Sequence, residues 1–272
     1  MGVRIEILTY AGTPAHLTQA KKFRYTTTPL KAQPVDLVNT PLLGAKAVHF
    51  LATPEEIQRQ VPELLSLRLR HGLQDRPFII WEPFPAYCTP QHRHSFIEAC
   101  KLVDVFSPNH HEMVALFEDK PSIDFSPRVL EQYALTFLPA VRPSTMAAIV
   151  IRAGKQGCLA VSSPAERVWL PAFYDDGSPK VVDPTGAGNA FLGGYMVGFH
   201  LNQDAVIASQ YGSVTASFAL EQIGLPIRED VKDQEYWNGV RVVDRLEQYK
   251  ARLENAAEFQ RKEQGAYFKS AA

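Results

Sequence analysis

Two glycines that stand one residue apart give the strongest chemical signal in this sequence. They lie in the segment VVDPTGAGNAF, residues 181–191, between an apolar pair and an apolar helical pattern. Gly186, Ala187 and Gly188 have side chains too small to cover their own N–H groups, and a helix is expected to begin at Gly188. Free amides at a helix N-terminus, with the positive end of the helix dipole, bind anions. The segment therefore predicts a site for a phosphate or another developing negative charge.

Glycine spacing alone is equally compatible with a plain tight turn between a strand and a helix. Two better known glycine motifs are excluded by the residues that follow. The Rossmann pattern GxGxxG needs a third glycine, which is missing, and the Walker A pattern needs GK followed by Ser or Thr, which is also missing.

Short apolar runs alternate with longer amphipathic segments along the chain. Strands are expected at 3–8, 47–51, 78–81, 103–106, 147–152, 158–161, 168–171 and 181–182, and helices at 53–72, 91–102, 110–117, 127–138, 188–200, 204–222 and 235–261. Residues 11–34 are expected to form a loop or an irregular hairpin. This alternation predicts an α/β fold, a three-layer α/β/α sandwich around a mostly parallel central sheet. No Pro/Gly/Ser-rich linker divides the chain, so one domain, 1–272, is expected.

The composition restricts the partners that this site could serve. The chain has 272 residues, and 28 basic side chains stand against 29 acidic ones. Without a basic excess, nucleic acid and a membrane surface are both disfavoured as partners. The three cysteines form no CxxC pair, and the N-terminal residues do not resemble a secretory leader. A cytoplasmic location is therefore expected.

The segment from Asp183 to Phe191 resembles the D-T-x-G-A-G-D-x-F signature of the PfkB carbohydrate kinases, whose fold is ribokinase-like. In that family the glycines form an anion hole, and the second Asp is the general base that deprotonates the substrate hydroxyl. The resemblance implies that Asp183 and Thr185 belong to the site with the anion-binding residues Gly186 to Gly188. Asn189 stands at the position of the base.

Three further segments agree with the family in order and spacing. SPNHHE at 107–112 resembles its P-N-x-x-E element, VIRAGKQGC at 150–158 its V-T-x-G-x-x-G strand and turn, and ASFALEQIG at 216–224 the helix beside the nucleotide. The resemblance covers roughly residues 75–225.

It implies ATP and Mg²⁺ as cofactors, with Asn109 and Glu112 near the metal. Lys155 and Gly157 would lie near the nucleotide, although an ordinary surface role for Lys155 is equally compatible with the sequence. Trp81-Glu82-Pro83 and Gly-Ala-Gly-Asn are most similar to a little-characterised fungal branch.

Two departures from the family pattern bear on function. An amide such as that of Asn189 cannot accept a proton at neutral pH, and general-base help contributes about 10²–10⁴-fold. The Gly-Gly-x-x-x-N element that holds the sugar is also missing, so the N-terminal part of the family fold is expected to be absent. A sheet edge left uncovered in this way would favour a homodimer or another cover.

Two functions stay open on these grounds, and whether the chain is an enzyme is uncertain. The first is an impaired PfkB-type kinase that transfers the γ-phosphoryl group of ATP to an alcohol of a sugar-like metabolite. The second is a degenerate or repurposed member, a pseudokinase, that uses the same pocket for metabolite binding or non-phosphoryl chemistry. A metal site at Cys88, His92 and His94 is disfavoured, because no second ligand cluster accompanies them.

Overall fold

A computed structural model gives the structure of residues 5–7, 23–25, 31–119, 124–144 and 146–270. Its centre is a six-stranded sheet with the strands in chain order. Four strands are parallel and the last two continue the sheet antiparallel. The strands are β3 (Ala47–Ala52), β4 (Phe78–Pro83), β5 (Val105–Phe106), β6 (Ala148–Arg152), β7 (Cys158–Ser163) and β8 (Glu166–Leu170).

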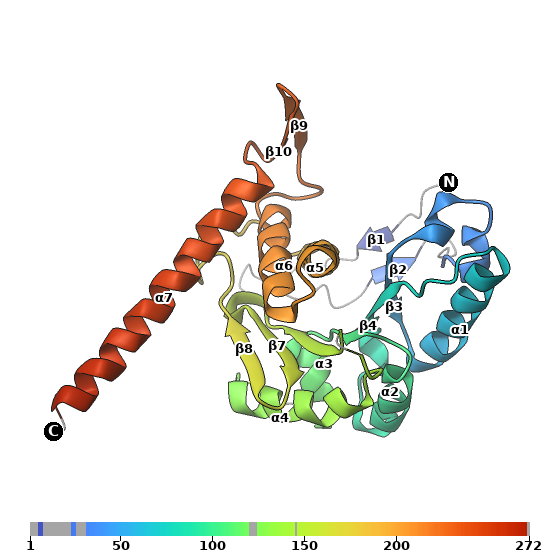
Figure 1. Cartoon of the computed structure of the whole chain (residues 1–272), viewed down its shortest axis with the longest axis horizontal. Coiled ribbons are helices and arrows are strands. Elements are labelled where there is room, and N and C mark those ends of the chain that lie inside the picture. The colour runs from blue at the N-terminus through green and yellow to red at the C-terminus, as the bar shows by residue number, and fades with distance from the viewer. Residues whose placement is uncertain (1–4, 8–22, 26–30, 120–123, 145, 271–272) are drawn as a thin grey trace.

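Helices cover both faces of this sheet (Figure 1). One face packs against α1 (Pro54–Arg70), α2 (Arg93–Cys100), α3 (His110–Ala115) and α4 (Pro127–Phe137). The other packs against α5 (Ala187–Asn202) and α6 (Ala205–Leu220). The predicted α/β/α arrangement with a mostly parallel sheet is confirmed. The prediction of a single domain stays a prediction.

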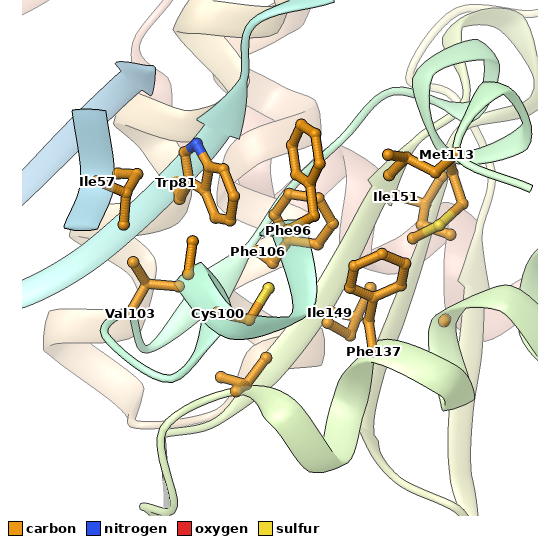
Figure 2. Packing of buried hydrophobic residues seen from close by; sticks show 14 of the residues in the cluster. Ile57, Trp81, Phe96, Cys100, Val103, Phe106, Met113, Phe137, Ile149 and Ile151 are labelled. Atoms are coloured by element: carbon orange, nitrogen blue, oxygen red, sulfur yellow. The ribbon is translucent and has the colours of Figure 1, made fainter. Parts of the chain in front are cut away.

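The larger core lies between the sheet and the helices α1 to α4 (Figure 2). Trp81 is fully buried at its centre, and its ring stacks on Phe96 with ring centroids 5.1 Å apart. The indole N–H donates to the carbonyl oxygen of Ala52 at 2.9 Å, so the one polar atom of this side chain is satisfied. Every residue of β4 is buried, as expected for an apolar run without polar alternation.

The residues that begin α1 explain its position. Thr53 is the N-cap, and its hydroxyl accepts from the amide of Glu56 at 3.2 Å. The Glu56 carboxylate accepts in return from the amide of Thr53 at 2.9 Å. This capping box, with Pro54 in the first turn, fixes the helix start where the sequence predicts it.

Helices α5 and α6 pack unusually closely, because glycines of α5 face side chains of α6. A Cβ atom at Gly194 would overlap Oγ1 of Thr215, and one at Gly198 would lie only 2.7 Å from the ring of Tyr211. Gly193, which is adjacent, has open space around it. The close contact positions α5 on the sheet, and with it the turn that precedes the helix.

The remaining elements lie outside the sandwich. β1 (Ile5–Ile7) and β2 (Phe23–Tyr25) pair antiparallel, as do β9 (Arg228–Val231) and β10 (Gln234–Trp237). The helix α7 (Val242–Ser270) extends away from the body of the molecule (Figure 1). Short 3-10 helices are η2 (Pro34–Leu37), η3 (Pro41–Gly44), η4 (Pro85–Tyr87), η5 (Pro90–His92), η6 (Leu138–Ala140) and η7 (Gly154–Gln156). Over the described residues no helix is both long and apolar enough to cross a membrane.

Two predicted elements are wrong. The helix expected from Glu235 begins only at Val242, because residues 234–237 pair with β9 instead. Val181 and Val182 form no strand: the amide of Val182 donates to the carbonyl oxygen of Leu220 at 2.7 Å, at the end of α6. The expected strand at 3–8 is described only over β1, and most of the segment 11–34 lies outside the described residues.

Candidate functional site

A cavity of about 640 Å³ lies beyond the carboxyl end of β6. This edge of a parallel sheet is where α/β folds usually bind ligands. One wall is the start of α5, with Pro184, Ala187 and Gly188. The other lining residues are Asn109, His110, Arg152, Gly154, Lys155, Gly157, the segment 172–178, Val181, Phe191, Ser213, Ala216 and Leu220.

The glycine turn presents an uncapped helix N-terminus to this cavity. Gly186 is the N-cap of α5, in the left-handed conformation with φ 82°, and no side chain caps the helix. The amide of Ala190 donates to the carbonyl oxygen of Gly186 at 2.9 Å, which begins the helical pattern. Ala187 and Gly188 line the cavity. The positive end of the α5 dipole therefore faces open space that a ligand can enter.

Other residues of the turn stay outside the cavity. The Asp183 carboxylate accepts from the amide of Thr185 at 2.9 Å, and this hydrogen bond lowers the pKa of Asp183. Asp183 thereby shapes the bend before the helix. Asn189, in the first turn of α5, is exposed. Among the residues described, Asp183, Thr185, Asn189 and the predicted anion-binding residue Gly186 are not part of the cavity lining.

Asn109 and Glu112 form a capping box at the start of α3. Oδ1 of Asn109 accepts from the amide of Glu112 at 2.9 Å, and Oε2 of Glu112 accepts from the amide of Asn109 at 2.7 Å. Burial raises the pKa of Glu112 to about 7. The amide of Asn109 and the charge of Arg152 oppose this shift, and the neighbouring Glu82 adds to it.

Arg152 and Glu82 form an ion pair beside the turn that the sequence analysis did not single out as a site. Nη2 of Arg152 lies 2.8 Å from Oε1 of Glu82 and 3.8 Å from Oε2 of Glu112. His49 lies behind Glu82, with Nε2 3.0 Å from Oε2. Burial opposes ionisation of Glu82, but the hydrogen bond from His49 and the charge of Arg152 outweigh it and lower the pKa of Glu82. A signal was present: FIIWE and AIVIR each end an apolar strand on a charged residue.

The model of the pfkB family of carbohydrate kinases matches residues 74–229, more than half of the chain. This chain belongs to the pfkB family. The expected family is therefore confirmed.

Curated relatives include two fungal proteins. The chain is 32% identical over 247 residues to an uncharacterized protein of Schizosaccharomyces pombe, covering 84% of this chain and 65% of the relative. It is 30% identical over 242 residues to Protein MAK32 of Saccharomyces cerevisiae, covering 84% and 64%. This pfkB chain thus spans about two thirds of the length of these relatives. Inositol 3-kinase of Arabidopsis thaliana is 30% identical over 103 residues, covering 36% of this chain and 28% of that kinase.

Solved structures with the same fold include a ribokinase II from E.coli in its apo form. It matches with a TM-score of 0.56 at 20% identity, covering 85% of this chain and 67% of that chain. Adenosine kinase from Sinorhizobium meliloti matches with a TM-score of 0.52 at 21% identity, covering 71% and 54%. The ribokinase-like fold of this pfkB chain is therefore shown.

Two residues after β6 complete the wall of the cavity in this pfkB chain. Nζ of Lys155 lies 2.8 Å from Oδ2 of Asp176, and both side chains are largely exposed. An exposed pair of this kind contributes only about 0–1 kcal/mol, so Lys155 can exchange its partner for a ligand at little cost. Gly157 has φ 85°, and a Cβ atom there would overlap the carbonyl oxygen of Leu170. Gly157 is therefore required by the turn itself.

The residues expected near magnesium do not form a metal cage. Asn109 and Glu112 each bind the backbone amide of the other, and the Glu112 carboxylate lies beside Arg152. No group of three His, Cys, Asp or Glu side chains suited to a metal ion exists in the part of the chain that the structure describes. All three cysteines are buried free thiols.

Proposed function

We propose that this pfkB protein binds ATP in the cavity beside α5 and transfers its γ-phosphoryl group, slowly, to an alcohol of a sugar-like metabolite. The observation that carries the proposal is the uncapped N-terminus of α5, which opens onto a cavity of about 640 Å³. Small-molecule sites commonly enclose about 300–1,000 Å³, so the space suits a nucleotide.

The lining of the cavity supports a nucleotide in one orientation. The amide of Gly188 and the amine of Lys155 would bind the phosphates, while the apolar side chains of Ala216 and Leu220 would contact the base. The amide of Ala187 donates to the carbonyl oxygen of Pro184 at 3.2 Å, so it is engaged within the turn. A ribokinase II from E.coli with the same fold, at a TM-score of 0.55 and 19% identity, has been solved in complex with ATP and Mg²⁺. Any magnesium here would be held by the phosphates and by water, as Mg²⁺ commonly is.

Asn189 would orient the acceptor alcohol rather than deprotonate it. Its amide can donate and accept hydrogen bonds, but it cannot take a proton at neutral pH. Phosphoryl transfer depends mainly on positioning and electrostatics, so a base-free site still turns over. The loss is expected to be about 10²–10⁴-fold. The relative inositol 3-kinase supports a polyol or sugar alcohol as the acceptor class.

The first test compares wild type with Asn189→Asp by calorimetry with ATP and Mg²⁺, and then by phosphoryl transfer to a panel of sugars and polyols. Both proteins should bind ATP, because the side chain of residue 189 is exposed and does not line the cavity. The Asp variant should transfer phosphate faster, by up to about 10²–10⁴-fold for its best acceptor. Absence of both binding heat and thermal stabilisation at millimolar ATP would contradict the proposal.

A second candidate function is metabolite binding without phosphoryl transfer. The observation in its favour is Asn189 itself, because the chain keeps the turn and the cavity but lacks the carboxylate there. Under this alternative, ATP binds but neither wild type nor Asn189→Asp transfers phosphate to any acceptor. Phosphoryl transfer by the Asp variant would instead favour the first candidate, a kinase site that lacks only its catalytic carboxylate.

A further inference from the structure

The guanidinium of Arg152 lies between two buried carboxylates and the glycine turn. Two partners hold it at Nη2. This nitrogen lies 2.8 Å from Oε1 of Glu82 and donates to the carbonyl oxygen of Ser107 at 3.1 Å. Glu112 lies 3.8 Å from the same nitrogen, and both carboxylates are buried. These contacts fix the orientation of the planar group, and so the direction of its remaining N–H donors.

The other terminal nitrogen, Nη1, points at the turn. A Cβ atom at Gly188 would overlap Nη1, so only a glycine leaves room for the guanidinium there. Arg152 and Gly188 both line the cavity. Within the described residues Nη1 donates no hydrogen bond to the protein, whereas Nη2 does. The Nη1 group of a guanidinium held in place by its other terminal nitrogen therefore lies beside Gly188, where α5 begins.

We propose that Arg152 takes the place of a divalent cation at this site and binds the oligophosphate of the nucleotide directly. The proposal rests on the proposed function, because it concerns the same cavity. Nη2 is engaged by Glu82 and Ser107, so Nη1 is the nitrogen left to donate to phosphate. A hydrogen bond from a charged guanidinium to phosphate is stronger than one between neutral groups. The carboxylates that would otherwise attract a metal ion already face this cation. Binding of an oligophosphate should therefore need no divalent ion.

The experiment measures binding of ATP and of inorganic tripolyphosphate by calorimetry, once in excess Mg²⁺ and once in EDTA. Wild type should bind both anions in EDTA within about threefold of its affinity in Mg²⁺. Arg152→Met should lose at least about tenfold in EDTA, which corresponds to one charge-assisted hydrogen bond, and Mg²⁺ should restore part of that loss. Wild-type binding that appears only with Mg²⁺ would overturn the inference, as would Arg152→Met binding in EDTA at wild-type affinity.

Arg152→Met removes the arginine partner of buried Glu82 and leaves it with His49. A second pair of variants keeps the test valid if Arg152→Met fails to fold. Gly188→Ala displaces the guanidinium and retains every ionic group, and Gly193→Ala makes the same change on the same helix in open space. Gly188→Ala should lower tripolyphosphate affinity in EDTA at least about tenfold, while Gly193→Ala should not change it. Equal affinities of the two variants would overturn the inference.

The measurements can contradict the proposed nucleotide function and the proposed role of Arg152 independently of each other. Tripolyphosphate binding that depends on Arg152, without any ATP binding, would support the cation substitution and remove the nucleotide function. ATP binding that requires Mg²⁺ would support the nucleotide function and remove the cation substitution. Binding of neither anion in either buffer would remove both.

Discussion

Glu112 shows how one buried carboxylate can make the whole protein sensitive to pH. Burial raises its pKa from 4.5 to about 7 in the folded protein. Between these values the folded chain holds a proton that the unfolded chain has released. The stabilisation is therefore fully present below about pH 4.5 and is lost as pH rises through about 7.

Glu112→Gln tests this residue. Glutamine can accept the same hydrogen bond from the amide of Asn109, so the cap of α3 survives, but the side chain no longer titrates. The free energy of unfolding of the variant, relative to wild type, should rise by on the order of 1–3 kcal/mol between about pH 5 and pH 8. Urea titrations at both pH values measure it, and a constant difference between the two proteins would contradict the pKa shift.

The sequence predicted some site residues and missed others for a physical reason. Glycine has no side chain that could cover the backbone amides. The uncapped turn at Gly186 to Gly188 could therefore be expected from the sequence alone. Arg152, Glu82 and His49 come from three different strands and become neighbours only through the register of the sheet. The local sequence places Glu82 and Arg152 at strand ends, but it does not show that the three side chains meet.

At the scale of elements, the contact between α5 and α6 fixes the position of the glycine turn that precedes α5. A Cβ atom at Gly194 would overlap Oγ1 of Thr215 in α6, whereas a Cβ atom at Gly193 would meet no other part of the molecule within 4 Å. The sequence pattern predicts both helices, but it does not show which glycine faces which helix.

Gly193→Ala and Gly194→Ala should therefore change stability in opposite directions. Alanine at 193 should stabilise by up to about 1 kcal/mol, because alanine is the better helix former. Alanine at 194 should destabilise by about 1–3 kcal/mol, because its Cβ atom overlaps Oγ1 of Thr215. Denaturant titration of the two variants checks this, and equal signs would show that the helices are not in this close contact.

The elements that the sequence misassigned share a cause. Residues 234–237 carry a polar pattern compatible with a helix, but the turn at Lys232 and Asp233, both with positive φ, folds them back on β9. Val181 and Val182 are apolar and β-branched, yet one backbone hydrogen bond to Leu220 holds Val182 at the end of α6. Tertiary contacts override local propensity in both segments.

At the scale of the whole molecule, α7 supports a wall of the cavity from the outside. Nη1 of Arg252 donates to the carbonyl oxygens of Phe173 at 2.6 Å and of Ala172 at 3.2 Å, and Nη2 pairs with Asp175 at 2.5 Å. Tyr249 adds a hydrogen bond to the carbonyl oxygen of Pro171 at 2.5 Å. The segment 172–178 lines the cavity on its inner side.

Arg252→Ala should weaken ATP binding although Arg252 is not part of the cavity lining. Without these hydrogen bonds the segment 172–178 is less fixed, and part of the binding free energy is spent on ordering it. The affinity for ATP should therefore fall by roughly threefold to tenfold. Arg241→Ala is the matched control, since Arg241 pairs with Asp244 on the exposed start of α7. Calorimetry on both variants measures the effect, and an identical loss in the two would argue against a supporting role for Arg252.

The three buried thiols carry a practical consequence. Cys88, Cys100 and Cys158 are each at most 5% exposed, and burial raises the pKa of each, so none presents a reactive thiolate in the native protein. A cysteine introduced at Val182, which is 55% exposed just before the glycine turn, would be the one position open to a maleimide dye. An environment-sensitive fluorophore there would report occupancy of the neighbouring cavity in real time, with no background labelling to subtract.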